Sequence, residues 1–510
     1  MTEYVNSTTG TNQEHAAPVI RMTSSEAKRG LRKTTERRQT VAKAFPIFPN
    51  TGDEYHLTEL GNAKRFVEQH GDEVRYCVTG GEWLIWTGKH WKKDENGEVM
   101  RRMEATVAAI YAEAAAYLAG IGSVNSKTER DHLATKAEAL TRWAKASESA
   151  RTMKNTLSLV VHQNDIPVVH DQLDAGDWLL NCRNGTVDLR TGTLREHRRE
   201  ELITRLVDID YDVDAIAPKW SGFLAEIFGG DGALVEYVQR MLGYSLTGST
   251  REQIMAVCYG TGSNGKSTLM ETVQGILGAY GQQAEFQTFL VRGNDTIRND
   301  LARMVGVRMI SASEGPDGAR LDEAVVKALT GGDKITARFL HKEYFEFKPK
   351  FSLWLSTNHR PSIKGTDEGI WRRIRLIPFN VTIPEERRDK TLPQQLHEER
   401  AGILTWMVQG CLNWHKNGLD TPQSVLDATG EYRAGQDDVG RWIDDCCFLA
   451  SAYEATAARL YDSYTEWCDE EGLRHPITKR RFGERLTERG LSPKKGTGGV
   501  RKWVGIALRG

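Results

Sequence analysis

Residues 254–277 read IMAVCYGTGSNGKSTLMETVQGIL and decide the fold of the middle of the chain. The apolar run Ile254–Tyr259 has the length of a buried strand, and Leu269–Leu277 has the composition of a helix. The loop between them satisfies G-x-x-x-x-G-K-[ST], whose glycines let backbone amides approach phosphate oxygens at the positive end of a helix. The alternative, a glycine-rich turn that binds nothing, is disfavoured by this strand–loop–helix context. The predicted phosphate contacts are Gly260, Gly262, Ser263, Asn264, Gly265, Lys266, Ser267 and Thr268.

Two residues of this loop have distinct predicted roles with ATP and Mg²⁺. Lys266 supplies a point charge between the β- and γ-phosphates, and Ser267 offers a hydroxyl to the metal. A second apolar strand ends in Glu314, a carboxylate that can orient water for attack on the γ-phosphate. Ser313 precedes Glu314 where an Asp is usual, so Mg²⁺ depends on Ser267, with Glu314 as the second candidate metal position. A surface Glu at a strand end is the alternative for Glu314.

Further polar residues follow the third strand, Phe351–Ser356. Asn358 comes directly after its end and can sense the γ-phosphate or fix the attacking water. The paired Arg372 and Arg373 suit an arginine finger that reaches the ATP of a neighbouring subunit. The alternatives are a strand-end turn for Asn358 and a structural ion pair for the two arginines.

Residues 335–349 read as a β-hairpin with a charged tip at His341–Glu343. His341 and Lys342 could enter a central pore and contact DNA phosphates. An exposed strand edge protected by charge is an equal alternative.

The C-terminal stretch concentrates positive charge. Residues 453–470 are expected to form one helix and 477–486 a second one with a basic face, followed by strand, glycine-rich basic loop and strand. This order is a winged helix-turn-helix pattern. Residues 478–510 hold ten Lys and Arg against two Glu, which suits phosphate contacts, while a protein-docking wing is the alternative. The predicted DNA-binding residues here are Arg480, Arg481, Arg485, Lys494, Lys495, Arg501 and Lys502.

The overall composition excludes several classes of protein. The chain has 510 residues with 68 Lys and Arg against 69 Asp and Glu, so neither a globally basic nucleic-acid coat nor an acidic scaffold fits. No run of about eighteen apolar residues is apparent, so no membrane span is expected. The seven cysteines lack zinc-ligand spacing and are expected to be reduced thiols.

Taken in order, these motifs resemble the superfamily 3 helicases, and more narrowly the helicase part of phage/plasmid and poxvirus-type primase–helicases. The resemblance covers about residues 50–510 and rests on Gly260–Thr268, Ser313-Glu314, Lys327–Asp333 with Arg338, Ser356–Asn358 and Trp371–Ile374.

This resemblance implies an α/β fold with an AAA+ P-loop ATPase core, assembled as a ring that is usually a hexamer. It implies ATP sites between subunits, unwinding of DNA at a replication fork, and 3′ to 5′ movement. Single-stranded and forked DNA and a separate primase or polymerase are the implied partners, and a cytoplasmic location is expected, in a bacterial host if the chain is phage-encoded.

The resemblance also assigns roles to individual residues. Lys266 and Ser267 match the phosphate and magnesium positions, Glu314 the water-activating carboxylate, and Asn358 the sensor. Arg373 matches the finger best, with Arg372 second. His341 and Lys342 fall where the family's pore hairpin lies.

The predicted domains follow from the same comparison. They are a disordered basic tail (1–44), an N-terminal α+β accessory domain (45–215), a helical collar (216–252), the AAA+ core (253–396), a helical extension (397–430) and a winged-helix DNA-binding domain (431–510). No primase domain or primase zinc motif is evident, so little priming activity is expected. The alternative function is an ATP-switched replication initiator or loader that does not unwind processively.

Overall fold

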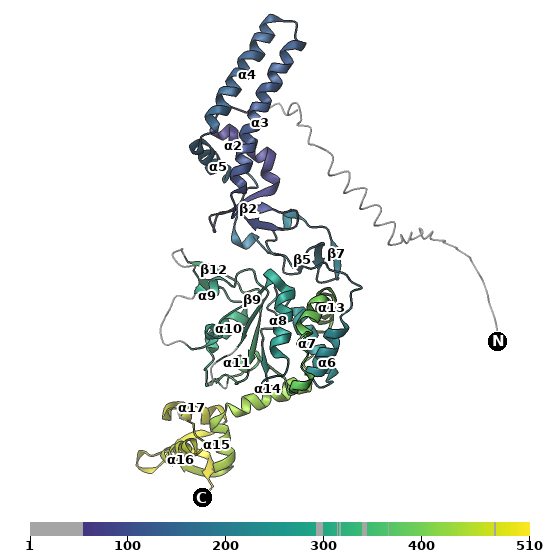
Figure 1. Ribbon diagram of the computed structural model, residues 1–510. Coiled ribbons are helices and arrows are strands. Elements are labelled where there is room, and N and C mark those ends of the chain that lie inside the picture. The colour runs from purple at the N-terminus through teal and green to yellow at the C-terminus, as the bar shows by residue number, and fades with distance from the viewer. Residues whose placement is uncertain are drawn as a thin grey trace, which may run out of the picture. The chain divides into compact units, whose positions relative to one another are not determined.

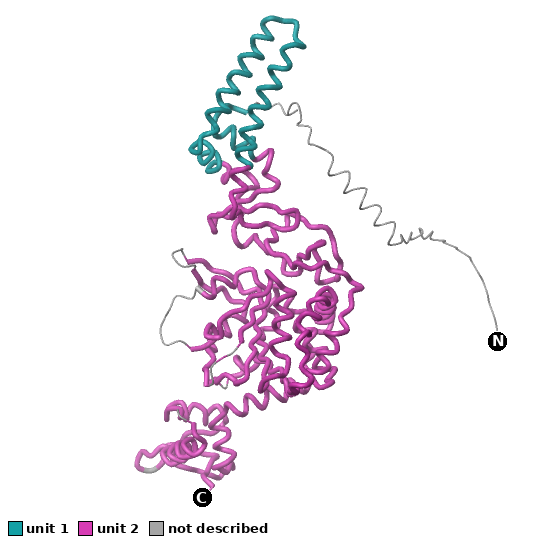
Figure 2. Tube along the Cα trace, in the orientation of Figure 1, with its two compact units in different colours: residues 1–66, 102–159 teal, residues 67–101, 160–510 magenta. Residues whose placement is uncertain are grey.

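The computed structural model forms two compact units, shown in different colours in Figure 2 (Figure 1 labels the elements). The first unit takes in residues up to 66 and 102–159, and the second takes in 67–101 and 160–510. The expected tail at 1–44 lies outside the described residues. The structure describes residues 55–291, 299–313, 315, 318–338, 344–365, 367–473 and 476–509.

The first unit is helical. Its helices pack around Ile110, Ala114, Leu140 and Ala144, which are all nearly fully buried. Ser126 begins one helix because its side chain accepts a hydrogen bond from the backbone N–H of Glu129 at the free first turn. The helices that contribute to this unit are α2 (Glu59–His70), α3 (Glu98–Gly120), α4 (Lys127–Ser147) and α5 (Ala150–Val160).

One helix in this part of the chain differs from the expectation of no membrane span. The stretch Glu98–Ser123 is long and apolar enough to cross a membrane by length and composition, with a mean hydropathy of 1.3. Alanines supply much of this hydropathy. The buried positions Met103, Val107, Ile110 and Ala114 recur on one side of the helix, which is also the pattern of a helix packed in a folded core.

The second unit begins with two small sheets. The strand expected around Trp83–Trp86 is confirmed as β2, and the two sheets have the orders β3-β2-β1-β4 and β5-β6-β7. Their strands are β1 (Val74–Cys77), β2 (Glu82–Trp86), β3 (Trp91–Lys93), β4 (Pro167–Val168), β5 (Leu179–Cys182), β6 (Gly185–Asp188) and β7 (Thr193–Arg195).

A five-stranded parallel sheet forms the centre of this unit, in the order β14-β8-β13-β10-β9. The α/β prediction for the core is therefore confirmed. All five strands run the same way, so their carboxyl ends meet at one edge, where sheets of this kind bind ligands. The strands are β8 (Met255–Tyr259), β9 (Gly281–Gln283), β10 (Met309–Ser313), β13 (Ser352–Thr357) and β14 (Ile374–Pro378).

Helices cover both faces of this sheet. Leu269 and Val273 of α8 are buried in one apolar core, whereas Val326 and Leu329 of α10 are buried in a separate core that also takes in Met255 and Val257 of β8. The helices here are α6 (Pro218–Ile227), α7 (Gly232–Tyr244), α8 (Lys266–Leu277), α9 (Asn299–Ala302), α10 (Glu323–Gly331), α11 (Glu368–Trp371), α12 (Leu392–Glu398) and α13 (Arg400–Asn417).

Two glycines let α7 and α13 approach backbone to backbone. A Cβ at Gly243 would lie 2.1 Å from the amide nitrogen of Cys411, and one at Gly410 would lie 2.1 Å from the carbonyl oxygen of Gln239. Any larger side chain would force the helices apart. This close contact holds α7 and α13 together. Tyr244 of α7 and Trp414 of α13 are both buried in the core beside the sheet.

The stem of the predicted hairpin is confirmed. Strands β11 (Ile335–Ala337) and β12 (Phe345–Phe347) pair antiparallel, with Ile335 opposite Phe347. The tip, with His341 and Lys342, lies outside the described residues.

The C-terminal part is a small α/β unit with its own core, which includes Trp442, Tyr464 and Phe482. The helix expected at 453–470 begins only at Ala457, because Thr456 caps it and the preceding residues belong to β15. Its sheet has the order β15-β17-β16. The elements are α14 (Gln423–Gly435), α15 (Asp438–Cys446), β15 (Cys447–Thr456), α16 (Ala457–Glu470), α17 (Lys479–Glu488), β16 (Ser492–Lys495) and β17 (Arg501–Leu508).

Candidate nucleotide-binding site

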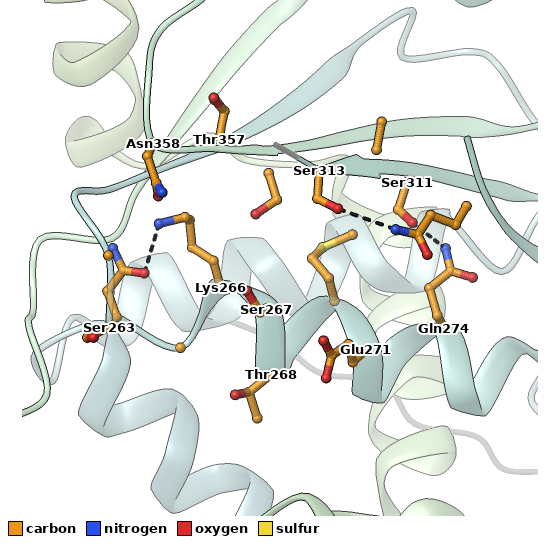
Figure 3. Close-up of a pocket in the computed structure, with 17 residues that line it drawn as sticks. Ser263, Lys266, Ser267, Thr268, Glu271, Gln274, Ser311, Ser313, Thr357 and Asn358 are labelled. Atoms are coloured by element: carbon orange, nitrogen blue, oxygen red, sulfur yellow. Dashed lines mark hydrogen bonds between the residues drawn. The ribbon is translucent and has the colours of Figure 1, made fainter. Parts of the chain in front are cut away.

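A cavity of about 430 Å³ opens at the carboxyl edge of the parallel sheet, between the loop after β8, the first turns of α8, and the ends of β10 and β13 (Figure 3). The predicted contacts from Gly262 to Thr268 line it. Asn358 lines it from the end of β13. The structure thus brings the predicted phosphate loop and the predicted sensor together, although Thr268 and Asn358 are ninety residues apart in sequence.

The backbone of the loop has a shape that few side chains permit. Gly262 and Gly265 have φ angles of +114° and +81°, and Ser263 between them has +48°. Successive residues in such conformations can turn backbone N–H groups toward one concave site, which suits an anion. Gly265 is also packed closely, because an added Cβ would lie 2.4 Å from Ile227 Cγ2 and 3.1 Å from Phe223 Cε2. The loop therefore packs directly against side chains of α6.

Lys266 begins α8 and is held inside the loop. Its side chain is 5% exposed, and its Nζ donates to the Gly260 carbonyl oxygen at 2.7 Å and to Asn264 Oδ1 at 2.9 Å. Asn264 in turn donates to the Phe379 carbonyl oxygen at 3.3 Å. Burial lowers the pKa of Lys266, because desolvation disfavours the charged form and the two described acceptors of its ammonium group are neutral oxygens. Incoming phosphate oxygens would supply the missing negative charge.

The residues present fit a metal ion that arrives with a nucleotide. Within the described ranges, no three His, Cys, Asp or Glu side chains are grouped so that they could hold a metal by themselves. Ser267 lines the cavity in the first turn of α8, and Ser313 lines it from the end of β10. Neutral hydroxyls of this kind suit Mg²⁺, which keeps several waters and takes further oxygens from phosphates. The second predicted metal position, Glu314, lies outside the described residues.

Two glutamines that the sequence reasoning missed hold the serines of β10. Gln274 Nε2 donates to Ser311 Oγ at 2.9 Å, and Gln283 Nε2 donates to Ser313 Oγ at 3.3 Å (Figure 3). Gln274 could have been found, because it lies eight residues after Lys266 and so on the same side of α8. Gln283 could not, because its position depends on β9 pairing with β10. Glu271, also missed, lines the same cavity from α8.

Asn358 lines the cavity directly after the end of β13. Figure 3 shows its side chain directed toward the ammonium group of Lys266. The turn behind it is fixed by Thr357, whose hydroxyl donates to the His359 carbonyl oxygen at 2.6 Å. This position fits the predicted contact with a γ-phosphate or its attacking water.

The two candidate arginine fingers lie at the opposite edge of the sheet. The Arg373 carbonyl oxygen accepts from the amide of Met255, the first residue of β8, whereas the phosphate loop follows Tyr259 at its end. Five strand residues span about 16 Å. Neither Arg372 nor Arg373 therefore lies at the cavity of its own chain.

The side chains of these arginines differ from the expected ranking. Arg373 is 8% exposed, donates from Nε to Thr330 Oγ1 at 3.1 Å, and also donates to the Gly369 carbonyl oxygen. Arg372 is exposed, and its side chain makes one described hydrogen bond, at 3.3 Å to Gln253 Oε1. Because the Arg373 guanidinium is already engaged in its own chain, Arg372 is the better placed of the two for a neighbouring subunit.

The predicted DNA-binding residues of the C-terminal part fall into two groups. Arg485 is 6% exposed, and its guanidinium donates to the Lys364 carbonyl oxygen and to Glu488, so its placement argues against the predicted phosphate contact. A buried arginine of this kind holds the structure together. The remaining predicted residues lie on accessible parts of α17, β16 and β17, namely Arg480, Arg481, Lys494, Lys495, Arg501 and Lys502.

Comparison with known proteins matches two family models. The "D5 N terminal like" model matches residues 63–229, and a family of unknown function (DUF5906) matches residues 258–373. The second match contains the whole phosphate loop and both candidate arginines.

The similar curated proteins come from large DNA viruses. "Putative helicase L207/L206" of Acanthamoeba polyphaga mimivirus is 29% identical over 321 residues, which are 58% of this chain and 33% of that protein. "Putative helicase 184R" of Invertebrate iridescent virus 6 is 27% identical, over 50% of this chain and 28% of that protein. "Putative primase C962R" of African swine fever virus (isolate Tick/Malawi/Lil 20-1/1983) is 24% identical, over 58% of this chain and 34% of that protein.

This chain thus spans about a third of the length of the curated relatives it matches. Among solved structures, the apo C-terminal region of NrS-1 is similar with a TM-score of 0.46 and 9% identity, over 88% of this chain and 99% of that one. The family matches and the viral relatives agree with the motifs of the parallel sheet, and together they support a member of the D5-type superfamily 3 helicase–primase family.

Proposed function

We propose that this chain is the ATP-dependent DNA helicase of a phage or plasmid replication system, with an AAA+ type core that assembles into a ring. The observation that carries the proposal is the placement of two features on one sheet. The phosphate loop with Lys266 lies at the carboxyl edge of β8, and Arg372 lies at the opposite edge. Among the described residues that line the cavity, Lys266 is the only cation, so a second cation is proposed to come from a neighbouring copy.

A head-to-tail contact between copies would complete that site. Such a contact uses two different surfaces of the same chain, and it generates a ring when the rotation between copies closes. In the ring, Arg372 of one copy faces the phosphate loop of the next. A hexamer is the ring we expect from the family.

The chemistry at the shared site follows from the residues that line it. The loop amides and Lys266 hold the phosphates, and Ser267 orients the bound metal, which supplies charge neutralisation of the γ-phosphate. Asn358 positions the attacking water or an oxygen of the γ-phosphate. Arg372 from the neighbouring copy offsets charge that develops in the transition state, a contribution typical of an arginine finger. Glu314 is the proposed activating base, on the grounds of its sequence position alone.

DNA contacts are proposed at two places. The hairpin of β11 and β12 follows α10 and is proposed to reach the strand in the ring's central hole. The C-terminal unit has two helices, α16 and α17, followed by the β16–β17 hairpin, which supports its assignment as a winged helix. Arg480 and Arg481 on the second of these helices are exposed, which supports a role in DNA binding.

The second candidate function is an ATP-switched initiator or loader that binds DNA without processive unwinding. The exposed basic face of α17 favours it, because such a surface also suits stable attachment to duplex DNA. Both functions need ATP at the same loop, so the ATPase alone does not separate them.

Strand displacement on a forked duplex tests the proposal. The helicase function predicts ATP-dependent release of the displaced strand and ATP hydrolysis stimulated by single-stranded DNA, both abolished by Lys266→Ala. Binding of the fork with ATP but without strand release would favour the initiator. Release that persists in Lys266→Ala would show that the site is misassigned.

A further inference from the structure

The outward face of the C-terminal sheet carries two exposed aromatic rings, Phe448 and Tyr453, that the functions above do not use. In β17, Trp503 and Ile506 face the core at 7% and 0% exposure, and the alternation is interrupted between them at Gly505, whose φ is +98°. Lys502 and Val504, on either side of Trp503, lie on the other face. Phe448 of β15 pairs with Ala507 on that same outward face. Phe448 is 50% exposed, so this large ring is left in water.

A bulge in β15 brings a second ring to the first. The pairing register jumps from Leu449 opposite Ile506 to Glu454 opposite Val504, so the intervening residues loop outward. This loop places the Tyr453 ring 6.5 Å from the Phe448 ring, and Tyr453 is itself 42% exposed. A short bulge thus creates an exposed aromatic pair that regular pairing would separate.

Cations flank this pair on both sides. The Arg509 guanidinium lies 5.2 Å from the centre of the Phe448 ring and is oriented by a 2.9 Å hydrogen bond to the Cys447 carbonyl oxygen. At the other end, Lys494 and Lys502 both pair with Glu454. On this face Lys494, Lys502 and Arg509 stand against the single carboxylate of Glu454, so the face carries a net positive charge.

From this arrangement we infer that the outward face of the sheet, centred on Phe448 and Tyr453, binds single-stranded nucleic acid by stacking bases on the two rings. Exposed rings offer a π-face that every base can use, and flanking cations pair with the phosphates between bases. A duplex keeps its bases stacked inside and cannot use such rings. A peptide would need a continuous apolar surface, which the lysines here interrupt.

The site is separate from the predicted duplex contacts on α17 and from the ATP cavity. It would hold the displaced or the incoming strand near the fork whether or not ATP is being hydrolysed. The inference extends the proposed function but does not depend on hydrolysis, so the two can fail independently.

Photo-crosslinking of the full chain tests the inference at the residue level. The probe is an oligo(dT) strand with 5-iodouracil in place of some thymines, irradiated without nucleotide, and the crosslinked peptide is identified by mass spectrometry. We expect crosslinks at Phe448 or Tyr453 in the wild type and equally in Lys266→Ala. An iodouracil RNA strand in a parallel arm shows whether DNA or RNA crosslinks more strongly.

Three variants separate stacking from simple apolar contact. Phe448→Leu keeps the apolar character but loses the ring, and should reduce the crosslink yield at this face by roughly 5- to 150-fold, the range for one base–aromatic stack. Phe448→Tyr should retain it. Leu449→Ala is the control, since Leu449 is 59% exposed next to Phe448 in sequence but pairs with Ile506 and so lies on the other face; it should change the yield by less than about twofold.

Either of two results would overturn the inference. One is crosslinking that maps elsewhere in the chain and spares residues 447–456. The other is competition by the same sequence in duplex form as strong as that by the single strand, because a duplex cannot stack its bases here.

Discussion

An added methyl group at Gly265 should strongly reduce both the stability of the protein and its affinity for ATP, although Gly265 lies in a loop. Gly265 has a φ of +81°, and a Cβ there would lie 2.4 Å from Ile227 Cγ2. Carbon atoms in good contact are about 3.5–4.0 Å apart. The Gly265→Ala substitution therefore meets both a backbone penalty and a steric one.

The size of the effect can be worked out from these two terms. A left-handed backbone at a non-glycine residue costs about 1–2 kcal/mol, and overpacking a core contact costs about 1–3 kcal/mol. We expect the free energy of unfolding to fall by about 2–5 kcal/mol. If the loop shifts to relieve the clash, backbone hydrogen bonds to phosphate are lost at about 1.5–3 kcal/mol each, so ATP affinity should fall at least about tenfold.

Gly275→Ala is the control within the same helix. Gly275 is exposed on α8 and has no atom within 4 Å of its added Cβ. Alanine is a better helix former, so this variant should be more stable by about 0.5–1 kcal/mol and should bind ATP as the wild type does. Urea unfolding and titration with a fluorescent ATP analogue measure both quantities. Equal stability and affinity in the two variants would refute the packing of the loop on α6.

Other predictions concern single side chains. Lys266 attracts phosphate only when it is charged, and burial lowers its pKa. ATP affinity should therefore be at its full value at neutral pH and should begin to fall, as the pH rises, below the ordinary lysine pKa of 10.5. Binding titrations across the alkaline range measure this. Asn358→Ala should retain ATP binding but reduce kcat by at least about tenfold, measured by steady-state hydrolysis. Arg485→Ala should lower the free energy of unfolding by about 1–3 kcal/mol, because it removes a buried side chain and its hydrogen bonds to Lys364 and Glu488. Arg480→Ala should change it by less than about 0.5 kcal/mol and weaken DNA binding instead, as thermal unfolding and DNA titration would show.

Local sequence was sufficient to predict the elements whose signals are contiguous. The strand, glycine loop and helix around Lys266 follow from one unbroken motif, and the hairpin stem of β11 and β12 follows from alternation. Asn358 was also predictable, because a polar residue at the end of a parallel strand lies at the ligand-binding edge of the sheet.

Features that depend on packing between segments far apart in the sequence could not be predicted from local sequence. Periodicity alone cannot tell which of the neighbouring Arg372 and Arg373 turns inward, because that depends on Thr330 and Gly369 accepting from one of them. Arg485 has the sequence context of a basic DNA-facing helix, yet it is buried because Lys364 offers an acceptor from another part of the chain. Basic residues in a sequence therefore identify a DNA-binding surface only when the fold leaves their side chains exposed.

The most direct test of a site shared by two copies is ATP hydrolysis in mixed rings. Lys266→Ala and Arg372→Ala should each be inactive alone. When the two variants assemble together at random, about a quarter of the interfaces pair an intact loop with an intact arginine, so hydrolysis should reappear. A parallel mixture with Arg373→Ala shows which arginine acts across the interface. Full hydrolysis by Arg372→Ala and Arg373→Ala alone, or no recovery in either mixture, would contradict the shared site.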